Sequence, residues 1–216
     1  AFDEVYNSKD EMQSFMVGLA LSQYLWGTHY EMFRHFTEGL QNNKKRIKSY
    51  LEIGPGHGLF FKKAIETIGN NCKYTAVDIS STSLNLTESI VSFFQLSNNN
   101  INFFNEDMLS IDTKELYDFI VMGEVLEHVE NPNILLDKLN SILADNGKAF
   151  ISTCVNCPTI DHVYHYKSIG EIQRMIKNSG FLINDERILP VENLEMEDIV
   201  EKKIAINYSA IISRQK

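Results

Sequence analysis

The chain has 216 residues, 44% of them apolar and 23% charged, which suits one compact domain and excludes a disordered or collagen-like chain. Its 20 basic and 29 acidic side chains give a formal net charge of −9, which disfavours nucleic acid and a polybasic membrane surface as partners. Three cysteines favour a reducing, cytoplasmic location, and the sequence shows no targeting segment or apolar run of the roughly 20 residues that span a bilayer.

The predicted elements alternate between strands and helices after a helical N-terminal section. Residues 1–46 have apolar side chains at helical spacing and are expected to form a helical lid or extension, with residues 47–216 as the main domain. Strands are predicted at 49–53, 74–77, 101–104, 117–122, 148–153, 181–188 and 203–212. Helices are predicted at 59–68, 81–96, 133–143 and 169–178, with an Asn146–Gly147 turn after the third of them.

This alternation predicts βαβ units and a mostly parallel sheet. The last two strands follow each other without a long helix, so one of them is expected to run antiparallel. Ligands of such sheets bind beyond the carboxyl ends of the strands, so the functional residues are expected just after each strand.

A glycine-rich loop follows the first predicted strand, in the sequence Leu51-Glu52-Ile53-Gly54-Pro55-Gly56-His57-Gly58. Glycines permit a sharp turn and let a ligand approach the backbone without a Cβ in the way. The G-x-G-x-G spacing is tighter than the G-x-G-x-x-G of dinucleotide-binding loops, which disfavours a nicotinamide-dependent oxidoreductase. For the loop taken alone, a structural turn is the alternative.

Carboxylates follow the next two predicted strands. Asp78 could accept hydrogen bonds from both hydroxyls of a ribose, and Asp107 from the amine of an adenine whose face Met108 covers. Either aspartate alone could instead be a helix cap or a turn residue. The glycine loop and both carboxylates, in this order and each at a strand end, favour a nucleoside-bearing ligand.

These motifs, with Gly123-Glu124-Val125-Leu126-Glu127-His128 after the fourth strand, resemble the successive motifs of class I S-adenosylmethionine-dependent methyltransferases over residues 47–213. The resemblance implies an α/β, Rossmann-like three-layer sandwich whose seven-stranded sheet has the order 3-2-1-4-5-7-6, with strand 7 antiparallel. It implies S-adenosylmethionine as cofactor and a small-molecule acceptor, with an oxygen or nitrogen atom favoured over carbon. The cofactor-binding residues would then be Glu52, Gly54, Gly56, Gly58, Asp78, Ile79, Asp107, Met108 and Glu124.

The segment after the fourth strand also predicts a metal site. If it is helical, Glu124, Glu127 and His128 share one face and can bind a divalent ion such as Mg²⁺. The pattern resembles the E-x-x-E-H of ubiquinone-pathway O-methyltransferases and of metal-dependent small-RNA 2′-O-methyltransferases, and His162 or His165 could add a further ligand. A helix cap with a substrate-facing polar pair is the alternative without metal.

The loop after the fifth strand, residues 154–166, is expected to face the acceptor. Catalytic roles are predicted for His128 and for His162, the latter as a base oriented by Asp161, although a surface-loop pair would look the same in the sequence. Tyr164 and Tyr166 could stack on a flat acceptor.

The same loop contains a Cys154-x-x-Cys157 pair. One such pair supplies at most half of a tetrahedral zinc site, no second pair exists in the sequence, and Cys72 is expected at the other end of the sheet. Neither zinc binding nor redox chemistry is therefore favoured.

An aromatic and histidine cluster marks the N-terminal section: Trp26, His29, Tyr30, Phe33 and His35. It fits a helix face packed on the core, or a lid that excludes water from the acceptor. Beside the favoured small-molecule methyltransferase, two functions stay open: an RNA 2′-O-methyltransferase, against which the negative charge weighs, and a non-catalytic cofactor- or partner-binding module. The oligomeric state is not predicted.

Overall fold

The computed structural model describes residues 9–96 and 99–215. The strands are β1 (Ser49–Ile53), β2 (Lys73–Val77), β3 (Ile101–Phe104), β4 (Tyr117–Gly123), β5 (Leu143–Val155), β6 (Phe181–Pro190) and β7 (Ile206–Arg214). The helices are α1 (Lys9–Leu25), α2 (Gly27–Asn43), α3 (Leu59–Ile68), α4 (Ser81–Phe93), α5 (Pro132–Ile142), α6 (Ile169–Asn178) and α7 (Met196–Glu201), with a 3₁₀ turn, η2, at Leu126–His128.

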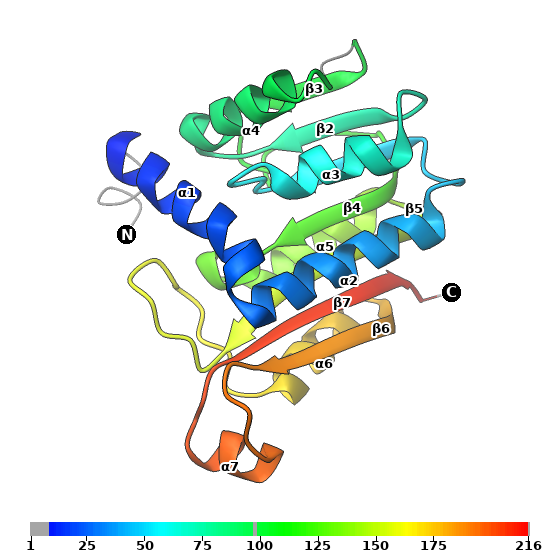
Figure 1. The fold of residues 1–216 in the computed structure, drawn as a ribbon. Helices are drawn as coiled ribbons and strands as arrows, with labels where there is room; N and C mark the ends of the chain where they lie inside the picture. Colours follow the sequence, from blue (N-terminus) through cyan, green and yellow to red (C-terminus); the bar gives the residue numbers. More distant parts are fainter. Residues whose placement is uncertain (1–8, 97–98, 216) are drawn as a thin grey trace.

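The strands form one sheet of order β3-β2-β1-β4-β5-β7-β6, as Figure 1 shows. All neighbours from β3 to β5 pair in parallel, and β7 pairs antiparallel with both β5 and β6. The predicted sheet order and the antiparallel last strand are thus confirmed. The carboxyl ends of β1 to β5 all meet at one edge, which we call the carboxyl edge.

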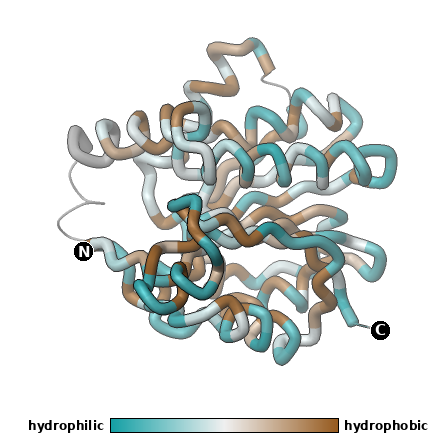
Figure 2. The backbone as a smooth tube through the Cα atoms, turned by 60° about the horizontal axis from the view of Figure 1, so that its bottom comes forward, coloured by the Kyte–Doolittle hydropathy of each residue, from teal (hydrophilic) through white to brown (hydrophobic). Residues whose placement is uncertain are grey.

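Helices cover both faces of the sheet, so the fold has three layers (Figure 1). Helices α2, α3 and α4 bury their apolar side chains with one face, around Phe36, Phe61 and Tyr50. Helices α5 and α6 pack on the other face, around Leu136 and Ile176. The central strands, buried on both sides, are apolar along most of their length, whereas the helices alternate between apolar and polar residues (Figure 2).

The N-terminal section forms two helices with different surroundings, while residues 1–8 lie outside the described part. Helix α2 belongs to the core, because Phe36 and Leu40 are fully buried against the sheet and α3. Helix α1 instead lies beside the carboxyl edge (Figure 1), where its buried Met16 faces the glycine loop. The division at residue 46 and the role of α1 as a lid stay predictions.

Two local predictions are wrong. Asn146–Gly147 forms no turn between helix and strand, since β5 already begins at Leu143 and pairs with Tyr117 before its register against β4 shifts. A Cβ on Gly147 would lie 3.0 Å from the Tyr117 carbonyl oxygen, so a glycine fits this close approach. Strand β7 begins at Ile206, later than the predicted residue 203, because the chain turns after α7: Lys203 has a φ of +51° and the N–H of Ile204 donates back to the Ile199 carbonyl.

Within residues 9–96 and 99–215, none of the helices combines the length and the apolar character that crossing a bilayer requires.

Candidate active site

The glycine loop turns sharply at the carboxyl end of β1. Gly54, Gly56 and Gly58 have φ angles of +66°, +53° and +73°, a region that favours glycine. A Cβ on Gly54 would lie 2.7 Å from Val125 Cγ2, and one on Gly58 would lie 2.8 Å from the Thr87 Cα atom. The loop therefore packs tightly against the segment after β4 and against α4, and its close approach to a ligand stays a prediction.

Asp78 lies beside this loop, as predicted. Its Oδ1 accepts a hydrogen bond from the Ser80 N–H at 2.8 Å, and its Oδ2 accepts one from the Ser83 hydroxyl at 2.5 Å. Burial raises the pKa of Asp78, and hydrogen bonds from Ser83, Ser80 and Gly56 oppose that rise. The carboxylate is thus fixed next to the loop, and the following Ile79 exposes 52% of its surface beside it.

The ends of β2 and β3 are tied together by Asn105, a residue that the sequence did not single out. Its side-chain amide donates to the Asp78 and Ile79 carbonyl oxygens at 2.9 and 3.0 Å. Asp107 is exposed and accepts a hydrogen bond from the Leu109 N–H at 2.9 Å. Met108 is 5% exposed and packs in the core, so this arrangement does not support its expected place over an adenine.

Glu52 lies beneath the glycine loop rather than in an open cleft. Its carboxyl group accepts a hydrogen bond from the Tyr50 hydroxyl and another from the Phe61 N–H in the first turn of α3. Burial raises the pKa of Glu52 to about 8, although both hydrogen bonds oppose the rise. The group is therefore protonated at neutral pH and ties β1 to an otherwise unpaired N–H of α3.

The segment after β4 is not a regular α-helix, so the condition under which Glu124, Glu127 and His128 would share a helix face is not met. Glu124 has a φ of +53°, and the 3₁₀ turn η2 follows it. The backbone N–H of Glu124 donates to the carbonyl and the hydroxyl of Ser152 at 3.1 and 3.2 Å. This reversal still brings the carboxyl groups of Glu124 and Glu127 together, because ligand atoms of both and of Cys154 lie within 4.8 Å of one another.

The two carboxyl groups are buried, and their protonation is coupled. Burial, and then the neighbouring charge of Glu127, raises the pKa of Glu124 well above its ordinary value. Burial also raises the pKa of Glu127 to about 7. Glu127 Oε2 accepts a hydrogen bond from the Thr153 hydroxyl at 2.8 Å, and the protonated Glu124 carboxyl shares a hydrogen bond with Glu127. Outside this pair, Oε1 of each glutamate is buried without a partner, so loss of the shared proton is costly unless a cation replaces it.

His128 and His162 are each oriented by a backbone carbonyl. His128 Nδ1 donates to the Asp161 carbonyl oxygen at 2.9 Å, and His162 Nδ1 donates to that of Cys157 at 2.6 Å. Because a carbonyl oxygen only accepts, each Nδ1 carries the proton and each Nε2 keeps a lone pair. The ring centroids are 5.0 Å apart, with the rings edge to face.

Asp161 therefore orients a different histidine from the one predicted. Its carboxylate Oδ2 lies 3.7 Å from His128 Nδ1, while Oδ1 accepts a hydrogen bond from the Thr159 hydroxyl at 2.7 Å. His162 is held by Cys157 instead. His165 is exposed and is not part of the histidine and carboxylate cluster.

Glu127, His128 and His162 form a donor set that fits a divalent metal ion. Their ligand atoms lie within 4.8 Å of one another. Glu127 offers a buried carboxylate oxygen, and the hydrogen bond from Nδ1 to a backbone carbonyl fixes each imidazole. Histidines that bind metals are commonly oriented by such a hydrogen bond from the other ring nitrogen. Of the two later histidines, the geometry favours His162 over His165, and metal binding itself stays a prediction.

The tyrosines of the loop are not free to stack on an acceptor in this conformation. Tyr166 is 2% exposed and its ring packs in the core, with its hydroxyl near the Met175 sulfur. Tyr164 donates its hydroxyl hydrogen to Glu171 Oε1 at 3.0 Å, and the two tyrosine rings are 4.8 Å apart. They brace the loop instead.

The N-terminal aromatic cluster divides into a core part and an exposed part. His35 is 1% exposed and bonded to the Ser209 hydroxyl at 2.8 Å, and Phe33 packs against the core. Trp26 and Tyr30 expose about half of their surface, and Trp26 stacks on His29 at 4.8 Å. The core interpretation is thus confirmed for His35 and Phe33, whereas a lid role for the exposed residues stays a prediction.

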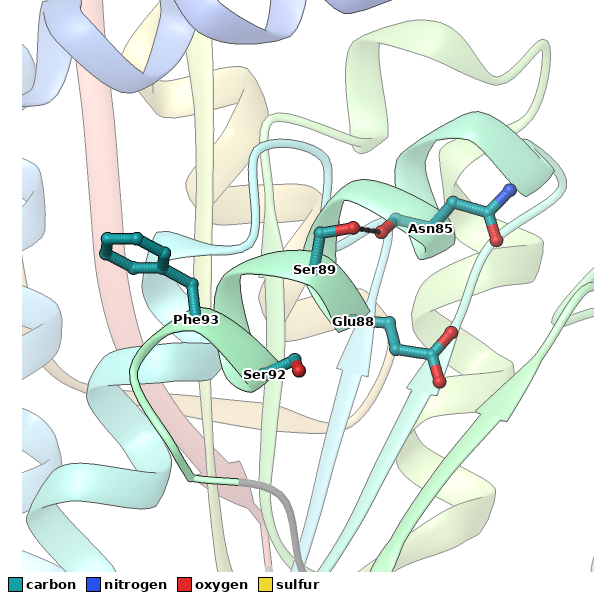
Figure 3. Close-up of a pocket in the computed structure, with 5 residues that line it drawn as sticks. All are labelled: Asn85, Glu88, Ser89, Ser92 and Phe93. Atoms are coloured by element: carbon teal, nitrogen blue, oxygen red, sulfur yellow. Dashed lines mark hydrogen bonds between the residues drawn. The ribbon is translucent and has the colours of Figure 1, made fainter.

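A shallow hollow on the outer side of α4 is lined by Asn85, Glu88, Ser89, Ser92 and Phe93 (Figure 3). The Ser89 hydroxyl donates to the Asn85 carbonyl within the helix, so it is already satisfied. Glu88 is the one titratable residue in this lining, which offers no metal-ligating or catalytic set. The chemistry-bearing residues gather at the carboxyl edge instead.

The chain is similar to known methyltransferases. A relative, the mitochondrial ubiquinone biosynthesis O-methyltransferase of Dictyostelium discoideum, is 30% identical over 134 residues, or 58% of this chain and 41% of that protein. The chain thus spans less than half the length of this curated relative.

Two solved structures share the fold. The N-methyltransferase NodS of Bradyrhizobium japonicum WM9, in complex with S-adenosyl-L-homocysteine, matches with a TM-score of 0.69 at 17% identity, over 95% of this chain and 98% of that one. The [4+2]-cyclase SpnF matches with a TM-score of 0.66 at 11% identity, over 84% of this chain and 80% of that one. The fold alone therefore does not distinguish methyl transfer from other chemistry.

A family model described as a methyltransferase domain matches residues 26–200. This range includes α2, the glycine loop, Asp78 and the whole cluster of Glu124, Glu127, His128 and His162. Because the match covers well over half of the chain, the protein belongs to the methyltransferase domain family.

Proposed function

We propose that the protein is an S-adenosylmethionine-dependent methyltransferase that transfers the methyl group to an oxygen or nitrogen of a small molecule. One observation carries the proposal: the carboxyl edge holds the glycine loop, Asp78 and the Glu124–Glu127–His128–His162 cluster together. Family membership supports it, as do relatives that are named O- and N-methyltransferases.

The residues around the glycine loop fit the cofactor. When bound, S-adenosylmethionine supplies an electrophilic methyl group on a positively charged sulfur. Gly54 and Gly56 would leave room for its amino-acid part, Asp78 would accept hydrogen bonds from the ribose, and Asp107 from the base amine. The exposed Ile79 would cover an apolar face of the base in place of the buried Met108.

The histidine cluster would remove the acceptor's proton. The Nδ1–H of His128 is fixed on the Asp161 carbonyl, which orients the ring, and a base positioned in this way contributes about 10²–10⁴-fold to the rate. Glu127, His128 and His162, with Glu124 beside them, would alternatively hold a divalent ion such as Mg²⁺, which lowers the pKa of a bound hydroxyl.

Binding and transfer are tested separately. Calorimetric titration with S-adenosylmethionine and S-adenosylhomocysteine tests the cofactor site, and absence of binding by folded protein would refute the proposal. Methyl transfer from radiolabelled cofactor to a panel of phenols, catechols and amines tests the reaction, since a cofactor-binding protein of this fold need not transfer methyl groups. Short RNA is included in the panel, and labelled RNA without a labelled small molecule would contradict the small-molecule class.

The cellular location belongs to this proposal as well. A cytoplasmic location rests on the small number of cysteines, all three of which are free in the structure. The Dictyostelium relative is named mitochondrial, so fractionation of cells that express the tagged full-length protein is the deciding measurement.

A further inference from the structure

The cysteine pair lies next to His162, at the point where β5 runs into the acceptor-side loop. Ligand atoms of Cys154, Cys157 and His162 lie within 4.8 Å of one another. Asn156, between the cysteines, has a φ of +53° and donates its N–H to the Tyr166 carbonyl at 3.1 Å, which turns the chain back on itself. The sequence contains no second cysteine pair, but the fold brings His162 next to the first pair, where its imidazole can supply a third ligand.

The spacing suits a tetrahedral ion. Cys154 Sγ lies 3.9 Å from His162 Nδ1. Zinc bonds of about 2.3 Å to sulfur and 2.0–2.1 Å to nitrogen place two tetrahedral ligands roughly 3.5 Å apart. For Cys154 and His162 an adjustment of a few tenths of an ångström suffices, and the other ligand atoms start within 4.8 Å of these two. Zinc would replace the hydrogen bond from His162 Nδ1 to the Cys157 carbonyl.

Glu127 is the natural fourth ligand. It is 1% exposed, its Oε2 is held by Thr153, and its Oε1 is buried without a partner. It belongs to one set of close ligand atoms with Cys154 and to another with His162, but to none with Cys157, so its carboxyl group has to move toward Cys157 when the ion binds. A carboxylate oxygen here would complete two sulfurs and one nitrogen.

We propose that Cys154, Cys157, His162 and Glu127 bind a thiophilic divalent ion such as Zn²⁺. Each thiol gives up its proton to solvent when the ion binds, and no electron is transferred. A neutral imidazole that binds through Nδ1 carries its proton on Nε2, so His162 cannot also bind a hard ion through Nε2. The thiophilic ion and a hard ion at Glu127, His128 and His162 thus exclude one another. This mutual exclusion rests on the hard-ion site of the proposed function, whereas the thiolate site does not.

Cobalt(II) is the probe, added to the reduced, metal-free full-length chain without cofactor. We expect saturable 1:1 binding with a thiolate-to-cobalt charge-transfer band in the near ultraviolet and the visible bands of a tetrahedral ion, both removed by Zn²⁺. In Cys157→Ser the charge-transfer band should fall and the affinity should drop by at least about tenfold. Cys72→Ser, which changes a thiol at the amino end of β2, should bind cobalt as the wild type does.

Each result decides between the alternatives. Cobalt binding without a charge-transfer band, an unchanged band in the Cys154→Ser/Cys157→Ser double variant, or no binding by folded protein would each overturn the site. X-ray absorption of the zinc complex must show sulfur neighbours at about 2.3 Å. Mutually exclusive binding is tested with Mn²⁺ as the hard ion, monitored by electron paramagnetic resonance. Zn²⁺ should release the bound Mn²⁺. Mn²⁺ that stays bound at saturating Zn²⁺ would refute the mutual exclusion and leave the thiolate site standing.

Discussion

The free energy of unfolding of the Glu52→Gln variant should increase relative to that of the wild type as the pH rises. The Glu52 carboxyl has an ordinary pKa of 4.5 and a pKa of about 8 in the fold, because burial penalises the charged form. The stability that protonated Glu52 provides is thus complete below pH 4.5 and is lost as the pH rises toward 8. Glutamine keeps the shape and the acceptor oxygen, but it cannot ionise.

The magnitude follows from the pKa difference. Each pH unit within the window costs the wild type about 1.4 kcal/mol, so between its ordinary pKa and neutral pH it loses roughly 3 kcal/mol that the glutamine variant keeps. Urea unfolding of both proteins at a series of pH values gives the difference in the free energy of unfolding. Other titrating groups cancel in this difference. A difference that stays flat between about pH 5 and 8 would refute the buried, neutral Glu52.

Four further predictions concern the site. Asp78→Asn should weaken S-adenosylmethionine binding by about 10–100-fold in calorimetry, while Asp118→Asn, which changes an aspartate at the amino end of the sheet, should not. Gly58→Ala should lower the free energy of unfolding by more than about 2 kcal/mol, because its Cβ meets Thr87. Gly69→Ala, at a φ of +88° but with open space around the Cβ, should lower it by only about 1 kcal/mol. Equal losses of unfolding free energy would exclude the clash with Thr87. His128→Gln should reduce kcat by at least about 100-fold with little change in cofactor binding, and His165→Gln should leave kcat intact. Binding of S-adenosylmethionine should release more protons than binding of S-adenosylhomocysteine, whose sulfur carries no charge, and the affinity for S-adenosylmethionine should rise with pH through about 7, where Glu127 titrates. Calorimetry in buffers of different ionisation enthalpy measures the difference.

The sequence predicted the sheet and the edge that carries the site, because periodicity and the strand-end rule depend on local patterns. Glycine spacing and Asp78 belong to this class, since each is placed by its own strand. The contacts within the cluster could not be predicted in the same way. Asp161 orients His128 across 33 positions of sequence, and the positive φ of Glu124 depends on Ser152. Met108 was expected over a ligand because its position after the strand is right, but only packing decides which way it faces.

The cluster at the carboxyl edge is best understood as a place that lacks positive charge. Glu52, Glu124 and Glu127 all have raised pKa values because they are buried, and no Lys or Arg is paired with them among the described residues. Burial without a counter-ion costs folding free energy. A cation that enters the edge offsets this cost for Glu124 and Glu127, because it replaces the proton that each carboxyl group gives up to the solvent. A sulfonium, a hard divalent ion and a thiophilic ion all meet this description. The carboxyl groups therefore favour a cation in general, and the ligand atoms around them decide which one: Gly54 and Asp78, the Nε2 atoms of the histidines, or the sulfurs of Cys154 and Cys157.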